Sequence, residues 1–195
     1  MKKIVLIDSH AIIHRAFHAL PPLTGRDGMP AGAVYGFASI LLRMLKELQP
    51  DYIAAAFDMP GKTFRHEQYE EYKAHRPPTP EELKSQFTKV HELVRAFGIP
   101  EVEHEGYEAD DMIGAMAEKF SREPDAEVMI VTGDADALQL VCRNVKVYTM
   151  KKGVSEIAIY DEDAVRERYG LQPRQLIDFK GLRGDPSDNI PGVKG

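Results

Sequence analysis

Short apolar runs, separated by longer stretches in which polar and apolar residues alternate, set the pattern of this chain. Three such runs predict buried strands of a parallel sheet: residues 4–7, 52–57 and 128–131. Two later runs, residues 145–150 and 157–160, predict strands on either side of a turn at Lys152 and Gly153. Because helical patterns lie between the first strands, the order of elements predicts an α/β fold with a parallel sheet.

The stretches between these runs carry apolar residues every three or four positions, as amphipathic helices do. One such stripe predicts a helix over residues 34–48. Another helix is expected to have Thr79 as its N-cap and Glu82 as the partner of a capping box. Its apolar stripe consists of Leu83, Phe87, Val90, Val94 and Phe97. Further helices are expected at residues 107–120, 161–169 and 174–182.

Composition places the chain among ordinary globular proteins. Of its 195 residues 43% are hydrophobic and 29% are charged, and no apolar run approaches the ~20 residues of a membrane helix. The first apolar run ends at Asp8, too early for a signal peptide, and the single Cys142 excludes an internal disulfide. We therefore expect a cytoplasmic protein with no membrane partner. The net charge of −6 argues against a nucleic-acid partner unless many acids share one metal site.

Each of the three predicted parallel strands is followed at once by an aspartate. Asp8 follows the first strand, Asp58 the second, and Asp134 the third, with Asp136 two residues later. Neighbouring strands of a sheet lie ~5 Å apart, and sites in parallel sheets form beyond the carboxyl ends of the strands. These carboxylates are therefore expected to crowd one small region.

Two further segments add acids to this set. Glu108, Asp110 and Asp111 open a predicted helix, and Asp185 and Asp188 share one loop. Taken singly, each segment is explained as well by ordinary turn and helix-start residues. Three strands that end alike favour a shared site, and carboxylates ~4 Å apart repel by roughly 1 kcal/mol in water, so they need cations. Oxygen ligands alone favour Mg²⁺ or Mn²⁺, and two such ions suit hydrolysis of a phosphodiester.

Three histidines offer a competing metal site. His10, His14 and His18 are spaced by four residues, so a helix after the first strand would place them on one face. A zinc protease motif has a glutamate beside its first histidine, and this segment has none. A packed structural face is the better interpretation.

At this point the sequence resembles a known family, the 5′-nuclease domains of bacterial DNA polymerase I, within the wider family of flap endonucleases and 5′–3′ exonucleases. The resemblance runs in order along the whole chain. It rests on residues 8–10, 15–21, 33–37, 57–58, 63–67 and 72–78, and on Glu108-Ala109-Asp110-Asp111, Thr132-Gly133-Asp134-Ala135-Asp136 and residues 184–195.

The resemblance implies a PIN-like parallel sheet flanked by helices, with a helical arch at about residues 61–80. It implies a metal-dependent 5′–3′ exonuclease and 5′-flap endonuclease that removes primers and flaps from DNA in replication and repair. The ligands of a first metal would be Asp8, Asp58, Glu108, Asp110 and Asp111. Those around a second metal would be Asp134, Asp136, Asp185 and Asp188. The metals would be two Mg²⁺ or Mn²⁺ ions.

The same resemblance implies how the substrate is held. Lys73 and Arg76, three residues apart and so on one face of an arch helix, would polarise the scissile phosphate, and Tyr72 would stack on a base. Arg15 and Arg65 are weaker candidates for phosphate contacts. The backbone at Gly192 and Gly195 and the side chain of Lys194 would meet the duplex backbone. The substrate would be DNA with a 5′ flap or 5′ end, or an RNA primer on DNA.

The chain departs from the family pattern at two places. Ala135 stands where the family often has lysine, which removes a basic neighbour but no ligand. The chain also stops at Gly195, within a helix–hairpin–helix-like element that starts at about residue 176 and follows a nuclease core of residues 1–175. In the family this element binds the duplex backbone beside a potassium ion. Duplex binding and the potassium site are therefore both expected to depend on a second helix. A polymerase domain in a longer chain is the expected neighbour.

Two other functions remain open at the level of sequence. A PIN-type ribonuclease would share the acid-lined sheet, although the arch motif and the segment Gly184-Asp185-Pro186-Ser187-Asp188-Asn189 argue against it. A non-catalytic DNA-binding module would follow if the short C-terminal element abolished activity. Cleavage of a 5′-flapped DNA separates all three functions.

Overall fold

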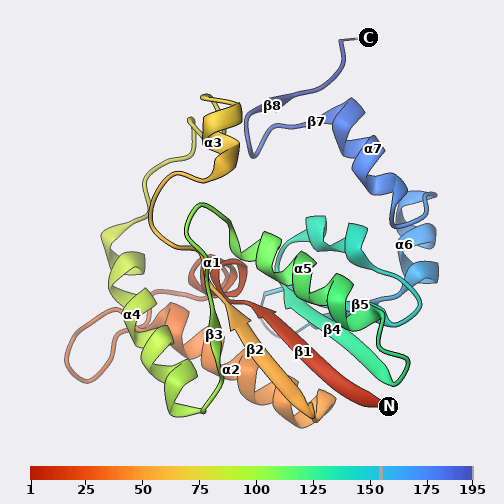
Figure 1. The fold of residues 1–195 in the computed structure, drawn as a ribbon. Helices are drawn as coiled ribbons and strands as arrows, with labels where there is room; N and C mark the ends of the chain where they lie inside the picture. Colours follow the sequence, from red (N-terminus) through yellow and green to blue (C-terminus); the bar gives the residue numbers. More distant parts are fainter. Residues whose placement is uncertain (154–155, 195) are drawn as a thin grey trace.

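The computed structural model describes residues 1–153 and 156–194. Its centre is a six-stranded sheet in the order β3-β2-β1-β4-β5-β6 (Figure 1). The strands are β1 (Lys2–Asp8), β2 (Tyr52–Ala56), β3 (Glu101–Val102), β4 (Ala126–Thr132), β5 (Val145–Lys152) and β6 (Glu156–Tyr160). Neighbours from β3 to β5 run parallel and β6 is antiparallel, which confirms the predicted parallel core and the later hairpin. The two-residue β3 has no apolar run, so the sequence pattern did not reveal it.

Helices cover both faces of the sheet (Figure 1). One face packs against α1 (Ser9–Ala19), α2 (Gly32–Leu48) and α4 (Glu81–Ala96), around a core that includes Phe37, Met44 and Val90. The other face packs against α5 (Ala109–Ser121), the 3₁₀ helix η1 (Ala135–Leu140), α6 (Glu162–Tyr169) and α7 (Gln175–Arg183). Within the described part of the chain, no helix has the length and apolar character needed to cross a membrane.

The helix starts show where local sequence signals decide and where they do not. Asp161 caps α6 as expected, because its carboxylate accepts the Ala164 N–H at 2.9 Å. The expected cap of α4 was wrong: the N-cap is Pro80, whose carbonyl already accepts the Leu83 N–H, and no side chain caps this helix. Phe97 was also assigned wrongly to the buried stripe, since the helix ends at Ala96 and Phe97 is 43% exposed.

Residues 61–80 leave the core as an excursion that holds only one short helix, α3 (Phe64–Gln68). Residues 70–75 form turns, and Lys73 has a φ of 55°, which a helix interior does not admit. The expectation that Lys73 and Arg76 share a helix face is therefore wrong.

The excursion is held by the C-terminal segment rather than by the sheet. The Lys73 N–H donates to the Asp188 carbonyl at 3.0 Å, and the Asn189 side chain donates to the Glu71 carbonyl at 2.9 Å. Thus the turns of residues 70–75, which follow α3, lie beside the loop of the small hairpin of β7 (Gly184–Asp185) and β8 (Ile190–Pro191), although more than 100 residues separate them (Figure 1).

Two glycines make the small hairpin possible. Gly184 has a φ of 77°, and a Cβ added there would overlap the backbone of Gly192. A Cβ at Gly192 would in turn overlap the carbonyl of Arg183. Because the two segments touch through bare backbone, only glycine fits both positions.

Candidate active site

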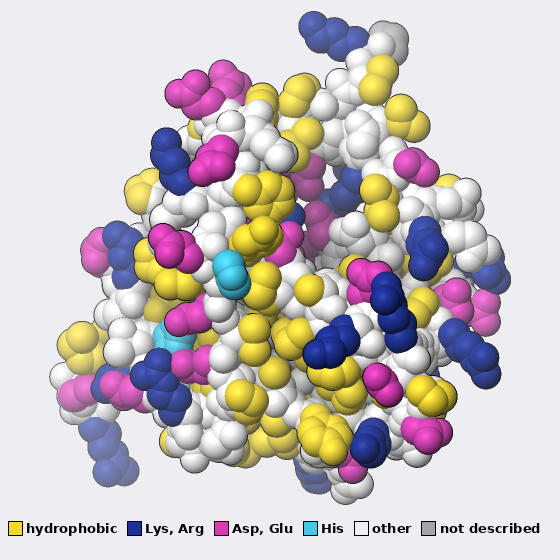
Figure 2. Space-filling view, in the orientation of Figure 1, with side chains coloured by type: hydrophobic (Ala, Val, Ile, Leu, Met, Phe, Trp, Pro, Cys, Tyr) yellow, Lys and Arg dark blue, Asp and Glu magenta, His cyan; other side chains and the backbone are white. Residues whose placement is uncertain are grey.

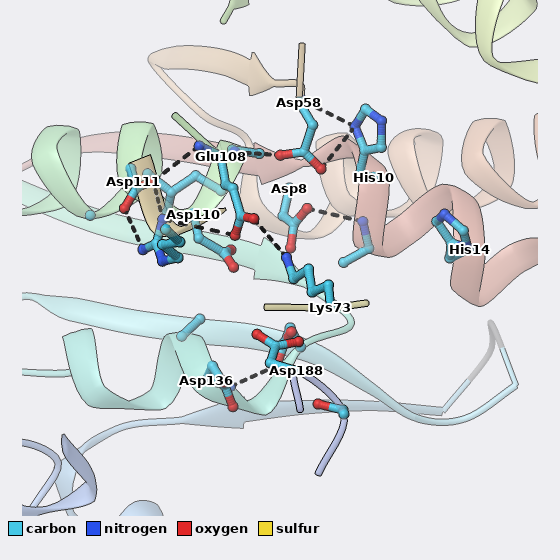
Figure 3. Close-up of a pocket in the computed structure, with 18 of the residues that line it drawn as sticks. Asp8, His10, His14, Asp58, Lys73, Glu108, Asp110, Asp111, Asp136 and Asp188 are labelled. Carbon is cyan, nitrogen blue, oxygen red and sulfur yellow. Dashed lines mark hydrogen bonds and ion pairs between the residues drawn. The ribbon is translucent and has the colours of Figure 1, made fainter. Parts of the chain in front are cut away.

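A cavity of about 580 Å³ opens at the carboxyl ends of β1, β2 and β4. Its acidic lining residues are Asp8, Asp58, Glu108, Asp110, Asp111, Asp134, Asp136 and Asp188. Figure 3 shows the carboxylates of Asp8, Asp58, Glu108 and Asp110 turned toward a common space, with the Lys73 side chain entering it. Of the nine predicted acids only Asp185 does not line this cavity. Carboxylates from five separate segments therefore meet, as the strand ends predicted.

Asp8 forms the buried floor of the cavity and is 3% exposed. Its carboxylate caps α1 by accepting the Ala11 N–H at 3.0 Å and accepts the Thr132 hydroxyl at 2.5 Å. Burial raises the pKa of Asp8 to about 6 in spite of these two hydrogen bonds, and the charges of Asp134 and Asp58 add to the rise. The two hydrogen bonds thus fix the Asp8 side chain in position, but they do not offset the cost of burying its negative charge.

Asp58 and Asp134 are held by backbone contacts at the ends of their strands. Asp58 accepts the Ala109 N–H at 2.6 Å, and its own N–H donates to His10 Nδ1 at 3.1 Å. Asp134 caps η1 by accepting the Asp136 N–H at 2.8 Å. Asp134 is therefore a local cap, whereas Asp58 binds the first residue of α5 from 51 positions away, and both acids face the shared cavity.

Asp110 projects from the first turn of α5 toward the acids of the sheet. Burial among protein atoms raises its pKa to about 8, and the charges of Asp8, Asp134, Asp58 and Glu108 raise it further in that order. The side chain nevertheless stays open to the solvent of the cavity. This carboxyl thus marks the point where negative charge is most concentrated.

Arg65 compensates the acids on the outer side of α5. Its guanidinium binds both carboxylate oxygens of Asp111, at 2.7 and 2.8 Å, and Asp111 also accepts the Glu108 N–H at 3.0 Å. Burial opposes ionisation of Asp111, but these hydrogen bonds prevail and lower its pKa. Arg65 therefore lies in the cavity wall, and its contact with phosphate stays a prediction.

The excursion of residues 61–80 adds the other predicted basic groups. The Lys73 ammonium lies 2.8 Å from a Glu108 oxygen, and Arg76 pairs with Asp188. The Tyr72 hydroxyl lies 3.1 Å from both acids and the ring is 5% exposed, so this tyrosine has no free face for stacking in this arrangement. Burial raises the pKa of Tyr72, which keeps the hydroxyl a donor.

Lys180 is a site residue that the sequence analysis missed. Its ammonium pairs with Asp136 and donates to Asp185 at 2.9 Å. Burial opposes ionisation of Asp185, but the Ser187 and Lys180 hydrogen bonds lower its pKa to about 2. Burial raises the pKa of Asp136 although Lys180 opposes this. Only the packing of α7 against η1 brings Lys180 here, so no local motif could have revealed it.

The histidines of α1 pack against one another and against Phe87. The rings of His14 and His18 stack at 6.3 Å, and His10 lies 4.7 Å from the Phe87 ring. Burial lowers the pKa of both His10 and His14. His10 and His14 nevertheless line the cavity, which the structural interpretation of this face did not anticipate.

The remaining predicted DNA contacts lie away from the acids. The Arg15 guanidinium donates to the carbonyls of Met150, Lys151 and Gly153, so it ties α1 to the end of β5. Gly192 packs against the Arg183 backbone, whereas Lys194 is exposed. Gly195 lies outside the described residues.

The donor set fits a hard divalent cation. The candidate ligands are carboxylate oxygens, and the pKa values of Asp8 and Asp110 are raised first by burial and then by the charges of neighbouring acids. Among the residues that the structure describes, no three His, Cys, Asp or Glu side chains stand ready to hold a metal ion. Several are engaged by Lys73, Arg65, Arg76 and Lys180 instead. Metal binding would therefore require these side chains to leave their ion pairs.

Comparisons with known proteins agree with this geometry. A family model described as "5′-3′ exonuclease, N-terminal resolvase-like domain" matches residues 3–170. DNA polymerase I of Bacillus caldotenax is 49% identical over 194 residues, which are 100% of this chain and 22% of that protein. DNA polymerase I of Chloroflexus aurantiacus is 50% identical over 197 residues, covering 98% of this chain and 21% of that protein. The chain thus spans about a fifth of these curated relatives.

The fold of this chain is similar along its whole length to that of a solved structure. The bacteriophage T5 flap endonuclease, solved with DNA and metal ions, superposes with a TM-score of 0.78 at 22% identity, over 100% of this chain and 71% of that chain. At this identity the likeness shows the fold alone, and it confirms the PIN-like architecture.

Proposed function

Since the chain belongs to the family of 5′-3′ exonuclease N-terminal resolvase-like domains, we propose that it hydrolyses phosphodiester bonds at the 5′ ends and 5′ flaps of DNA. The observation that carries the proposal is the meeting of eight acidic side chains from five chain segments in one cavity. A structural role alone does not account for such crowding, because like charges repel in a site of low dielectric.

We propose two Mg²⁺ or Mn²⁺ ions as the cofactors. Asp8, Asp58, Glu108, Asp110 and Asp111 would hold the first ion, directly or through water. Asp134, Asp136, Asp185 and Asp188 would surround the second. When bound, such ions lower the pKa of a coordinated water and stabilise a leaving oxygen. Asp185 lies beside the cavity and is paired with Lys180, so this acid has the weakest claim as a direct ligand.

The basic residues of the wall would bind the phosphate. Lys73 and Arg76 are now paired with Glu108 and Asp188, and a phosphate entering between the acids would offer them an alternative anion. Their charges would also balance the charge that grows on the phosphate during hydrolysis. Ser9 and Cys142 do not line the cavity, so neither supports a covalent route.

The excursion of residues 61–80 would act as the arch through which the 5′ end of the strand passes. This role is supported by its position beside the cavity and by its tether to the loop of residues 184–191. The T5 structure was solved with DNA, and the two relatives compared above are DNA polymerase I proteins. The substrate would thus be a DNA flap or 5′ end, or an RNA primer on DNA, and a polymerase would lie in the same longer protein.

A cleavage assay on 5′-flapped DNA tests the proposal. The chain should cut the flap in Mn²⁺ or Mg²⁺ and stop when EDTA is added. Asp134→Asn should abolish cutting while the fold stays intact by circular dichroism, and Asp125→Asn, at the opposite end of the sheet, should cut as the unaltered chain does.

Three results would point elsewhere. Wild-type turnover by Asp134→Asn would refute the metal role of the acids. Flap DNA that is bound in EDTA yet stays uncut in Mn²⁺ would favour a binding module. Faster cutting of single-stranded RNA than of flap DNA would favour a PIN-type ribonuclease.

A further inference from the structure

Three aromatic side chains gather just outside the cavity, between α3 and the loop that leads into α5. The rings of Phe64 and Tyr107 lie 5.5 Å apart, and those of His104 and Tyr107 lie 5.1 Å apart and nearly perpendicular. Tyr107 is 43% exposed, so one part of its ring faces solvent. Figure 2 shows hydrophobic side chains and a histidine on this face, beside a hollow in which acidic and basic side chains are visible.

The aromatic group continues directly into the wall of the cavity. Arg65 lies over the Phe64 ring at 4.6 Å, and the same guanidinium binds Asp111 inside the cavity. Tyr107 immediately precedes Glu108, another lining residue. The Phe64 ring therefore contacts both Arg65, which reaches into the cavity, and Tyr107, which lies just outside it.

The position of the Tyr107 ring is fixed before anything binds. The Phe64 N–H donates to the Gly106 carbonyl at 3.0 Å, which ties the start of α3 to this loop. His104 Nδ1 lies 2.9 Å from the Glu105 carbonyl, so the histidine that abuts Tyr107 is itself held. A held aromatic ring with an open face loses little conformational entropy when a flat partner stacks on it.

We propose that Tyr107 is a stacking site for a base of the single-stranded 5′ end, with Phe64 and His104 as positioning residues and Arg65 as a contact for the adjacent phosphate. The inference rests on the proposed function, because the strand reaches Tyr107 only if its phosphate enters the acidic cavity. Nucleobases of every kind present a flat π-face, so the site reads no sequence. The Arg65 charge beside the rings suits a polyanion better than an apolar protein segment.

The test compares flaps with and without a base. Wild type and Tyr107→Ala are each given a 5′-flap DNA whose flap is normal or abasic, and Kd in EDTA and kcat/KM in Mn²⁺ are measured. On the normal flap, Tyr107→Ala should bind and cut about 5- to 20-fold less well, the lower part of the range for loss of one base–aromatic stack. On the abasic flap the two proteins should behave alike, since the missing ring then has no partner.

Two further variants separate stacking from structure. Tyr107→Phe should retain the wild-type preference for the normal flap. Phe97→Ala removes an aromatic ring of equal exposure, 43%, at the distant end of α4 and should behave as wild type. A 2-aminopurine base in the flap should lose fluorescence on binding to wild type and keep it with Tyr107→Ala.

The outcomes also separate this site from the proposed function. If wild type cuts flap DNA but Tyr107→Ala shows the same loss on both flaps, or none, the stacking site is overturned and the nuclease stands. If wild type neither binds nor cuts flap DNA, the proposed function is overturned and the stacking site with it.

Discussion

The acids in and beside the cavity differ in how far basic side chains balance their charge. We call Asp8, Asp110 and Asp134 the floor acids. Within the described part of the chain no basic side chain pairs with them, and burial raises the pKa values of Asp8 and Asp110. We call a second set the rim acids, which pair with Lys73, Arg65, Lys180 or Arg76: Glu108, Asp111, Asp136, Asp185 and Asp188. The pKa values of Asp111 and Asp185 are lowered.

The difference shows that the two sets do separate work. Each rim pair joins two segments: Arg76 joins the excursion to the C-terminal loop, and Lys180 joins α7 to η1. In the part of the chain that the structure describes, the floor acids form no ion pairs that connect chain segments, and they repel one another. Without a bound cation they therefore lower the stability of the fold. The floor is therefore the part of the cavity where basic side chains balance the acids least, and the rim is the part whose ion pairs connect chain segments.

The largest expected effect comes from neutralising a floor acid. Asp110→Asn removes a carboxylate that repels Asp8 and Asp134, so in EDTA at pH 8 the variant should melt at a higher temperature than wild type. It should also lower kcat on flap DNA by about 10²- to 10³-fold or more, the scale on which one preorganised electrostatic group matters. Calorimetry and the cleavage assay measure the two changes.

A higher melting temperature together with a lower kcat is the result that distinguishes a floor acid from a rim acid. In saturating Mg²⁺ the melting advantage of Asp110→Asn should vanish, because only wild type gains fully from metal binding. Asp125→Asn, which removes an exposed acid at the far end of the sheet, should change neither quantity. An Asp110→Asn protein that melts below wild type in EDTA would contradict the repulsion assigned to the floor.

A second and smaller effect concerns pH in the absence of metal. A carboxyl whose pKa is raised by folding holds its proton more firmly in the folded state, so stability falls as pH rises toward the folded pKa. Because the folded pKa of Asp110 is about 8, stability in EDTA should decline between pH 6.5 and 8. Asp8, with a folded pKa of about 6, contributes its decline mainly below this window. The lowered pKa values of His10 and His14 act in the opposite direction, but only below pH 6.5.

The expected fall in melting temperature over this window is about 3–5 °C, kept modest because cavity solvent reaches Asp110. Asp110→Asn should flatten most of the slope, and saturating Mg²⁺ should flatten it in wild type. A melting temperature that rises from pH 6.5 to pH 8 in EDTA would show that the floor acids are ionised at little cost.

Much of the fold could be predicted from sequence because its signals are local. Apolar runs marked β1, β2 and β4, and Asp161 marked the start of α6. The failures came where tertiary contacts decide. Lys73 adopts a left-handed backbone conformation in a turn tied to Asp188, and nothing in the spacing of Lys73 and Arg76 announces that contact.

The candidate site also contains residues that local sequence predicts and residues that only tertiary packing places there. Asp8, Asp58 and Asp134 could be predicted because a strand end is a local feature and parallel strands bring their ends together. Lys180 and His10 could not, since each reaches the acids through the packing of its helix. Arg15, expected near phosphate, instead binds carbonyls at the end of β5, a segment that sequence alone did not place beside α1.

The smallest expected effect tests the rim. Lys180→Met keeps most of the side-chain volume but leaves Asp136 and Asp185 without their shared cation. Because the lysine is partly exposed, the loss should be on the order of 0.5 kcal/mol, which lowers the melting temperature by about 1–2 °C. Thermal unfolding in EDTA at pH 7 measures it, and the shift should shrink in high salt, which screens exposed charges.

Lys84→Met is the matched control, because it breaks a solvated pair with Glu81 on α4 and should leave the melting temperature unchanged. The direction of the Lys180 result then decides between two descriptions of the cavity. A loss means that Asp136 and Asp185 are stabilised by their pairing, in contrast to Asp110, where removing a charge stabilises. A gain would mean that the cost of burying Lys180 exceeds its attraction to both acids. The distinction between floor and rim would then rest on burial alone and not on charge compensation.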